Sequence, residues 1–331
     1  MSAKLSLPKL NFVPSYLRVK QDRPPTYKDR ERLLVGGHEH TYWQAPFTDE
    51  APRPDGPLPL LIGLHGFGST GSRLGWWSGL GTRAPAAGFL AVFPDATGQV
   101  WDDHGTGRLD GRDDYRFLAA LVDHLVETEN ADPERIFITG VSTGATVTER
   151  LIRTGIVHAR AAALVCGTAR SASRDVTAIA VERMPLLMFA GTRDPMVPYA
   201  GGDPTGVLGR VALHTVAKFL IDPSGHDSVG PERLAAEWAA VNGCHPIPEI
   251  DDVETDPGDP LVRRMSWLPA DPAGAPVIYY RMDGGGHGWP SGKQYLPIKL
   301  IGMIPQHFDA TAIVLDFARE HLGIPAPAST D

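Results

Sequence analysis

A serine flanked by small residues is the clearest chemical signal in this sequence. Ser142 stands in GVSTG, between the apolar run RIFIT and the segment TGATVTERLI, whose spacing predicts a helix. A serine at a sharp turn from strand to helix stands clear of the sheet and can attack a substrate, provided that the positions two before and two after it are small. Gly140 and Gly144 satisfy that condition. We therefore predict that Ser142 is a nucleophile; the alternative is a chance match to a short pattern.

A serine hydroxyl needs a base beside it, and two residues further along the chain can supply one. Asp194 follows the apolar run PLLMFA, and His287 follows APVIYYRM inside the stretch GGGHGWP. The glycines of this stretch have no side chains to pack, so we expect His287 to stand on an exposed loop. The order serine, acid, histidine is that of hydrolases whose nucleophile lies on a strand-to-helix turn. We predict that Asp194 orients His287 and that His287 is the base for Ser142. The alternatives are a turn aspartate before proline and an ordinary loop histidine.

Two backbone amides are expected to stabilise the negative charge that such an attack creates on the substrate oxygen. One belongs to Thr143, directly after the nucleophile. The other should come from the loop in LLIGLHGFGST, where Phe67 follows a histidine and a glycine. We expect that histidine, His65, to brace the loop rather than to titrate during catalysis. Trp101 and Trp289 are candidates for binding the acyl or alcohol group, with core packing as the alternative for each.

Short apolar runs alternate with segments of helical spacing, and this alternation predicts the fold class. Strands are expected in RERLLV, HEHTYW, LLIGLHG, AGFLAVFPD, RIFITGVS, ARAAALVCG, PLLMFAG and APVIYYRMD, and helices in DDYRFLAALVDHLVET, TGATVTERLIRTG, ERLAAEWAAVNG and FDATAIVLDFAREHL. Buried strands that alternate with helices form a mostly parallel sheet flanked by helices on both faces. We predict an α/β-hydrolase fold, with residues 1–27 as an extension and residues 28–325 as a single catalytic domain.

The order of motifs along the chain resembles that of a known enzyme family. LHGFGST, GFLAVFPDATGQVW, DDYRFLAALVDHL, DPERIFITGVSTGA, GTRDPMVPYAGG, NGC and GGGHGWP follow one another as in the polyhydroxybutyrate depolymerase and feruloyl esterase family of α/β-hydrolases, which also includes acetylxylan esterases. The resemblance implies ester hydrolysis by a triad of Ser142, Asp194 and His287, with no metal and no organic cofactor.

The chain departs from the family pattern at three points. Ala145 stands where a second glycine is common. Cys244 matches a family cysteine whose usual partner precedes the histidine strand, and RRMSWLPADPAGAPVIYY contains no cysteine, so we expect no disulfide there. Residues 206–230 form a longer connection after the acid than is usual in the family. We expect this segment to shape one wall of the substrate site; the alternative is a helix docked on the outer surface.

Composition bounds the function further. The 331 residues carry a net charge of −8, which disfavours a nucleic-acid partner. No run of roughly eighteen apolar residues predicts a membrane span, and MSAKLSLPKLNFVPSYLRVK lacks the unbroken apolar stretch of a secretory signal. The two cysteines form no disulfide framework, and Cys166, after the apolar run AAALV, is expected to be a small buried residue. We expect a cytoplasmic location; the alternative is a secreted protein without its signal.

Two weaker signals could indicate metals. His38 and His40 share one face of a predicted strand, but no third ligand is apparent, so a solvated strand face is favoured. The acidic stretch WDDHGTGRLDGRDD lacks the spacing of a calcium loop and is expected to be a surface loop with a helix cap.

The residues together predict hydrolysis of a small or polymeric carboxylic ester through a covalent acyl-enzyme. Amide or polyamide hydrolysis by the same residues and acyl transfer are the enzymatic alternatives. A non-catalytic, polymer-binding protein on the same scaffold is the third, and it has no use for a nucleophile, an acid and a histidine together.

Overall fold

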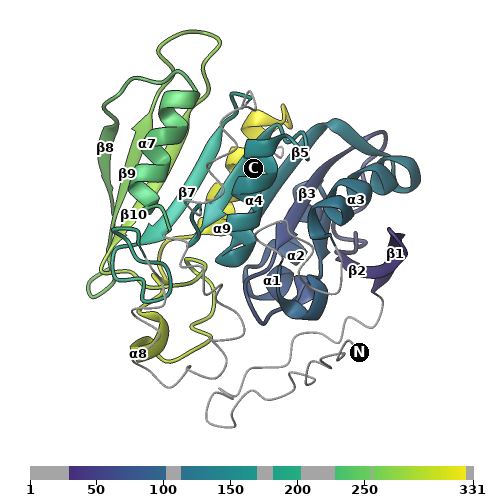
Figure 1. Ribbon diagram of the computed structural model, residues 1–331, viewed down its shortest axis with the longest axis horizontal. Coiled ribbons are helices and arrows are strands. Elements are labelled where there is room, and N and C mark those ends of the chain that lie inside the picture. Colours follow the sequence, from purple (N-terminus) through teal and green to yellow (C-terminus); the bar gives the residue numbers. More distant parts are fainter. Residues whose placement is uncertain (1–29, 102–112, 170–181, 203–227, 255, 326–331) are drawn as a thin grey trace, which may run out of the picture.

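One mixed sheet runs through the middle of the molecule (Figure 1). The computed structural model describes residues 30–101, 113–169, 182–202, 228–254 and 256–325. Its strands are β1 (Glu31–Val35), β2 (His38–Gln44), β3 (Leu58–Leu64), β4 (Leu90–Pro94), β5 (Ala131–Val141), β6 (Ala161–Val165), β7 (Leu186–Gly191), β8 (Glu249–Val253), β9 (Leu261–Trp267) and β10 (Val277–Asp283). Its helices are α1 (Gly71–Trp77), α2 (Leu80–Ala86), the 3₁₀ turn η2 (Thr97–Gln99), α3 (Asp114–Glu129), α4 (Thr143–Thr154), α7 (Pro231–Val241), α8 (Ile298–Ile301) and α9 (Ala310–His321).

The sheet is parallel in its centre and antiparallel at both edges. The strand order is β1-β2-β4-β3-β5-β6-β7-β10-β9-β8. Neighbouring strands from β4 to β10 pair in parallel, whereas β2 pairs antiparallel with β1 and β4 at one edge, and β9 pairs antiparallel with β8 and β10 at the other. Because β5, β7 and β10 run in the same direction, the residues that follow these three strands come to one edge of the sheet.

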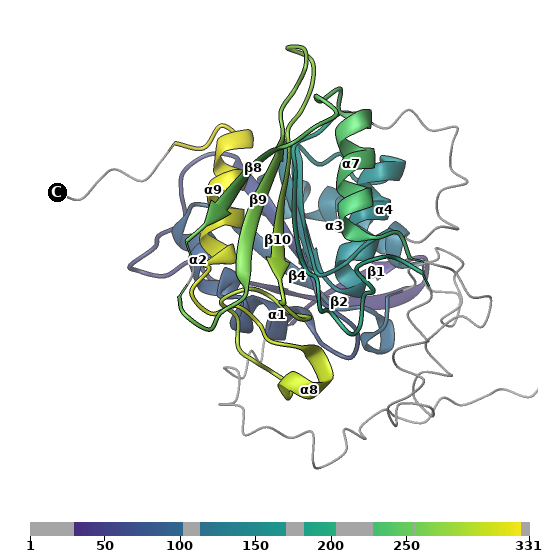
Figure 2. The ribbon, with the colours of Figure 1, turned by 90° about the vertical axis from the view of Figure 1, so that its left-hand side faces the viewer.

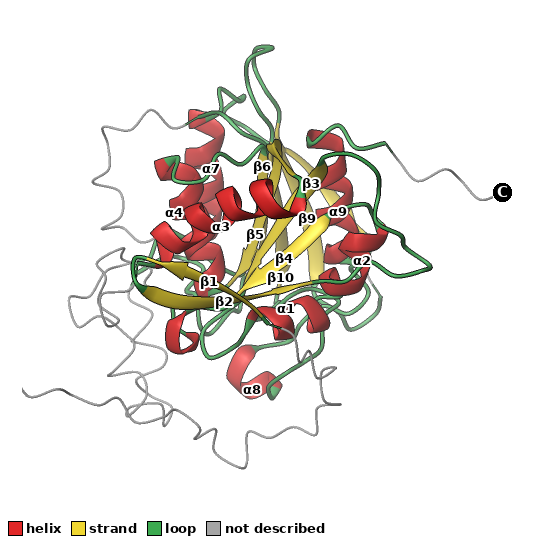
Figure 3. Ribbon diagram, turned by 90° about the vertical axis from the view of Figure 1, so that its right-hand side faces the viewer, coloured by secondary structure: helices red, strands yellow, loops and turns green. Residues whose placement is uncertain are grey.

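Helices cover both faces of the sheet, which explains why its central strands are apolar along their whole length. Figures 2 and 3 show α2 and α9 on one side and α3, α4 and α7 on the other. Every residue of β3, β4, β6 and β7 is buried. Strands buried on both faces have no solvent-facing positions, so they lack the alternation of a half-exposed strand. The predicted α/β-hydrolase fold, a mostly parallel sheet flanked by helices, is confirmed.

The predicted strands and helices are present, and local sequence explains how several begin and end. The side chain of Asp113 caps α3 by accepting a hydrogen bond from the Arg116 amide at 3.0 Å. Gly36 and Gly37, both with positive φ, connect β1 to β2 as expected. Six elements were not predicted: β8, β9, the 3₁₀ turn η2 and the short helices α1, α2 and α8. β8 (EIDDV) is an exposed, acidic edge strand, and α2 contains a proline, so neither has a clear local signal.

Several expectations fall on parts of the chain outside the described residues. These are the extension 1–27, the acidic loop after Trp101 and nearly all of the segment 206–230. The residues on either side of the undescribed part are placed: Gly202 and Ser228 exchange two backbone hydrogen bonds of 2.9 Å. The domain limits of 28–325 and the cytoplasmic location stay predictions. Among the described residues, no helix is long and apolar enough to cross a membrane.

Candidate active site

Ser142 occupies a strained turn between β5 and α4. Its backbone has φ 57° and ψ −123°, and its amide donates to the Val165 carbonyl at 2.9 Å, which ties the turn to the neighbouring strand β6. A Cβ on Gly140 would lie 2.3 Å from the Gly144 carbonyl oxygen, and one on Gly144 would lie 2.2 Å from the Leu64 carbonyl oxygen. Both positions therefore have to be glycine, and this close backbone packing explains why small residues are expected two positions before and after the serine.

Asp194 follows β7 and uses both of its carboxylate oxygens. Oδ1 accepts hydrogen bonds from the amides of Met196 at 2.7 Å and Val197 at 2.9 Å. Oδ2 lies 2.7 Å from Nδ1 of His287. The two amides fix the rotation of the carboxylate, so the second oxygen is held toward the imidazole. The sequence placed both residues at the same edge of the sheet, and the structure brings them into direct contact.

His287 is held on a tightly packed loop after β10. Its amide donates to the Ile301 carbonyl at 2.5 Å, and its own carbonyl accepts from the Tyr295 hydroxyl at 3.3 Å. A Cβ on Gly286 would lie 2.2 Å from the Ile301 carbonyl oxygen, so the glycine allows residues 301–303 to pack against the loop. The histidine is only 3% exposed. The glycine-rich stretch thus permits close backbone packing, and the loop is not the exposed one that its composition predicts.

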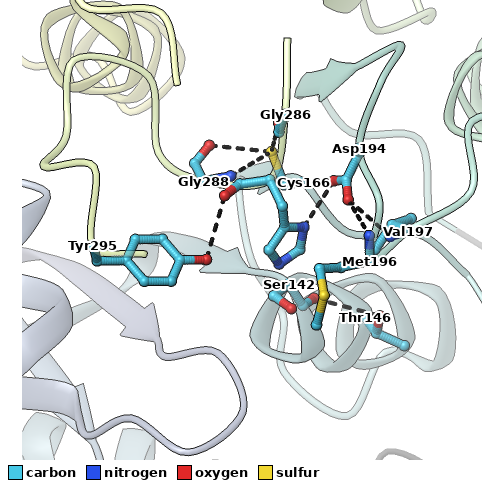
Figure 4. A network of polar contacts seen from close by, with 10 residues as sticks. Ser142, Thr146, Cys166, Asp194, Met196, Val197, Gly286, Gly288 and Tyr295 are labelled. Carbon is cyan, nitrogen blue, oxygen red and sulfur yellow. Dashed lines mark hydrogen bonds and ion pairs between the residues drawn. The ribbon is translucent and has the colours of Figure 1, made fainter. Parts of the chain in front are cut away.

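Ser142 and His287 approach each other from different strands. In the view of Figure 4, Ser142 lies below the imidazole ring that a dashed line joins to Asp194, on the side of the ring's other nitrogen. Since Nδ1 is engaged by the carboxylate, Nε2 is the nitrogen available to the serine. The structure shows no hydrogen bond between the serine hydroxyl and Nε2, and such contacts often tighten only when substrate is bound.

The loop after β3 brings its backbone against Ser142. A Cβ on Gly66 would lie 3.2 Å from Cβ of Ser142, so the next residue, Phe67, follows directly beside the nucleophile. The amides of Phe67 and Thr143 donate to no acceptor among the described residues. Two unengaged amides next to a serine could stabilise an oxyanion. The assignment of these two amides stays a prediction.

His65 braces this loop as a neutral residue. Its Nε2 accepts a hydrogen bond from the Ala96 amide at 3.0 Å, so Nδ1 carries the proton and donates to the Gly66 carbonyl at 2.7 Å. Burial lowers the pKa of His65 to about 4. The ring is uncharged at neutral pH and holds the turn in place, which confirms the bracing role.

Trp101 and Trp289 are both packed inside the protein. Trp101 is 3% exposed, and its indole N–H donates to the His65 carbonyl at 2.8 Å. Trp289 is 0% exposed and donates to Thr311 Oγ1 at 2.9 Å. Their contacts are those of the core-packing alternative, and a contact of either ring with substrate stays a prediction. Phe67, on the loop after β3, is an exposed apolar side chain, at 40% exposed.

Cys166 and Tyr295 also lie at this site, although neither was predicted to be there. Cys166 follows β6, the parallel neighbour of β5, so the strand-end argument that found Asp194 could have found it. Its burial was expected and is confirmed, and both cysteines are unpaired. Tyr295 reaches His287 from a loop without regular structure, and nothing in the sequence marks it.

Cys166, Asp194 and His287 form the one group of three potential metal ligands found within the described residues, with ligand atoms within 4.8 Å of one another. Their existing bonds do not suit an ion. Nδ1 and Oδ2 are already paired at 2.7 Å, and burial raises the pKa of the thiol, which opposes the thiolate that a metal needs. His40 stacks on Phe117 with a centroid distance of 4.2 Å and forms no such group with His38.

Comparison with known proteins shows which proteins this chain is similar to. No family model matches the chain. The protein named "Putative esterase NocK" from Nocardia uniformis subsp. tsuyamanensis is 25% identical over 309 residues, which cover 92% of this chain and 86% of that protein. Feruloyl esterase B of Piromyces equi is 27% identical over 246 residues, and the match spans 72% of this chain but 41% of the relative. The solved structure of acetyl xylan esterase from Aspergillus awamori aligns with a TM-score of 0.55 at 16% identity, covering 87% of this chain and 99% of that one.

These matches bear out the esterase part of the resemblance, whereas none of these three proteins carries the name polyhydroxybutyrate depolymerase. The solved structure supports the fold, and the sequence relatives support the type of reaction. The chain has the α/β-hydrolase fold, is similar in sequence to curated esterases, and is a carboxylic ester hydrolase.

Proposed function

We propose that this esterase works through a triad of Ser142, His287 and Asp194 and a covalent acyl-enzyme. The observation that carries the proposal is the buried 2.7 Å contact between His287 Nδ1 and Asp194 Oδ2, next to a serine on a strained strand-to-helix turn. A loop histidine or a turn aspartate without catalytic work would have no reason to form this pair beside that serine.

In the first half of the reaction, Asp194 keeps the proton on Nδ1 of His287, so Nε2 is free to accept one. Nε2 takes the hydroxyl proton of Ser142 as Oγ attacks the carbonyl carbon of the ester. The resulting oxyanion accepts hydrogen bonds from the amides of Phe67 and Thr143. The tetrahedral intermediate then collapses, the bond to the alcohol oxygen breaks, and Nε2 returns the proton to the leaving alcohol.

In the second half, water replaces the alcohol. Nε2 of His287 accepts a proton from the water, whose oxygen attacks the carbonyl carbon of the acyl-enzyme. The same amides hold the second oxyanion. Its collapse breaks the bond to Ser142, releases the carboxylic acid and returns the proton to Oγ, so the enzyme is regenerated without a cofactor.

The esters to examine first are those in the relatives' names, acetyl and feruloyl esters. Hydroxybutyrate oligomers follow from the family resemblance. A panel of these esters with p-nitrophenyl esters of rising chain length and a peptide-like amide would separate these substrate classes. The peptide-like amide tests amide hydrolysis, because the same triad can also expel an amine.

Substitution of Ser142 by alanine tests the proposal. Loss of a triad nucleophile costs roughly a million-fold in kcat in a well-studied protease, so Ser142→Ala should reduce ester hydrolysis to background. A fluorophosphonate probe should label the wild type at Ser142 and fail to label either Ser142→Ala or His287→Ala. Ser291, another serine with positive φ, offers a matched control, and Ser291→Ala should retain activity and labelling. Activity of Ser142→Ala above about a thousandth of wild type would exclude Ser142 as the nucleophile.

A further inference from the structure

The thiol of Cys166 joins the two peptides on either side of His287. Its Sγ lies 3.1 Å from the carbonyl oxygen of Gly288 and 3.8 Å from that of Gly286, and it accepts a hydrogen bond from the Gly288 amide at 3.4 Å. The contact with Gly288 spans 122 residues of sequence. A single side chain from the end of β6 thus bonds to the residues immediately before and after the histidine (Figure 4).

The backbone of Cys166 is unusual in a way that matches this contact. Its φ of 48° lies in the left-handed region, which a residue with a side chain adopts only at a cost in free energy. A glycine at position 166 would adopt that conformation more readily. Strained residues of this kind concentrate at active sites, and Ser142, with φ 57°, is the corresponding residue at the end of the adjacent strand β5.

The chemical state of the thiol determines what it can do. Cys166 is 1% exposed, and burial together with the nearby Asp194 carboxylate raises its pKa well above that of an ordinary thiol. The sulfur therefore keeps its proton and acts as a hydrogen-bond donor to the Gly288 carbonyl while accepting from the Gly288 amide. A protonated, buried thiol is a poor nucleophile, so a covalent role is disfavoured.

We propose that Cys166 is a positioning residue that holds the His287 loop in the orientation needed to accept the proton of Ser142. This inference rests on the proposed triad. The thiol contacts the peptides flanking the histidine, while Ile301 and Tyr295 bind the amide and the carbonyl of the histidine itself. A small displacement of the His287 ring would slow proton transfer from the Ser142 hydroxyl to Nε2 without changing how the substrate binds.

The test compares four variants of the two cysteines. Cys166→Ala removes the donor, and Cys166→Ser restores a shorter one. Cys244 offers a matched control, because its Sγ also donates to a backbone carbonyl, that of Ala275 at 3.0 Å, but at the opposite end of β10. We expect Cys166→Ala to lower kcat by about 10-fold or more, with KM within about twofold, because a small misplacement of a catalytic group is costly. Cys166→Ser should recover most of that loss, and Cys244→Ala and Cys244→Ser should match wild type.

Two further measurements separate positioning from packing. The proton between His287 Nδ1 and Asp194 should give a far-downfield NMR resonance in the wild type, and this signal should broaden in Cys166→Ala and return in Cys166→Ser. Cys166→Gly removes the thiol while relieving the left-handed strain, so it guards against loss of fold in the alanine variant. We expect it to show the same drop in kcat.

Unchanged kcat in folded Cys166→Ala or Cys166→Gly would overturn the proposal, as would a serine variant no better than alanine. Failure of both the alanine and the glycine variants to fold would overturn it too, because the thiol would then hold the fold rather than the histidine. Failure of the triad itself is recognised separately: Ser142→Ala would then keep ester hydrolysis whatever the cysteine variants do.

Discussion

Replacing Asp194 by asparagine reverses the hydrogen bond that this residue can make to His287. Oδ1 accepts from the amides of Met196 and Val197, so the carbonyl oxygen of the asparagine has to take that position. The amide nitrogen then replaces Oδ2 and points its hydrogens at Nδ1. The imidazole can pair with it only by moving its own proton to Nε2. The nitrogen that faces Ser142 is then a donor and cannot accept the hydroxyl proton.

The expected size of the effect follows from this tautomer. In a well-studied serine protease the same substitution lowers kcat about 10⁴-fold while leaving the geometry intact, which corresponds to ~5 kcal/mol of transition-state stabilisation. Stability should change little, because a near-isosteric side chain keeps both backbone hydrogen bonds. Replacing an ionised acceptor by a neutral one should cost about 1 kcal/mol of unfolding free energy.

The assay is steady-state hydrolysis of p-nitrophenyl acetate at neutral pH, with urea unfolding measured on the same samples. Asp132 is a matched control, since its Oδ1 also accepts from a backbone amide, that of Glu134 at 2.9 Å, and its Oδ2 from a side chain, Arg135 Nε at 2.6 Å. Asp132→Asn should keep the wild-type kcat, because it lies at the far end of β5 from Ser142. If Asp194→Asn kept more than about a tenth of the wild-type kcat, the tautomer argument and the assignment of the acid would both be wrong.

Three further outcomes are expected. Burial lowers the pKa of His65 to about 4, so the unfolded chain binds more protons than the folded protein below about pH 6.5. The free energy of unfolding should therefore fall by up to ~3 kcal/mol as the pH drops from about 6.5 to 4. Urea titrations of wild type and His65→Gln at about pH 7 and 5 would contradict this if both proteins lost the same free energy of unfolding. Gly286→Ala, whose Cβ would lie 2.2 Å from the Ile301 carbonyl oxygen, should displace the histidine loop and lower kcat about 100-fold or more, and an active variant with an unchanged thermal midpoint would refute that packing. EDTA should leave ester hydrolysis unchanged, whereas inactivation that zinc reverses would revive a metal site at His38 and His40.

The residues of the proposed triad could be found in the sequence because their signals are local. Ser142 needs glycine two positions away on either side, and the structure shows that a Cβ at either position would collide with backbone. Asp194 and His287 each follow an apolar run long enough to be a buried strand. Once such strands are parallel, their carboxyl ends meet at one edge of the sheet, so chain order alone brings the three residues together.

The edge of the sheet was harder to predict. β9 (LVRRMSW) carries two adjacent arginines, and β8 (EIDDV) is exposed at nearly every position. Their pairing places Asp251 opposite Arg264 and Asp252 opposite Arg263. β9 also buries Val262, Met265 and Trp267 in the core, whereas β8 is exposed along most of its length. The cross-strand charge pairs that hold β8 against β9 are visible only when both strands are considered together.

The sequence alone determined the fold class, the order of the proposed triad residues and the strand-to-helix turn at Ser142, because hydrophobic periodicity and glycine positions act within a few residues. Only the tertiary structure decided that Cys166 lies against the histidine loop, that Trp101 and Trp289 are buried, and that the glycines around His287 serve close packing against residues 301–303. These features depend on contacts between segments far apart in the chain. Such contacts exist only after the sheet has formed, so no local pattern encodes them.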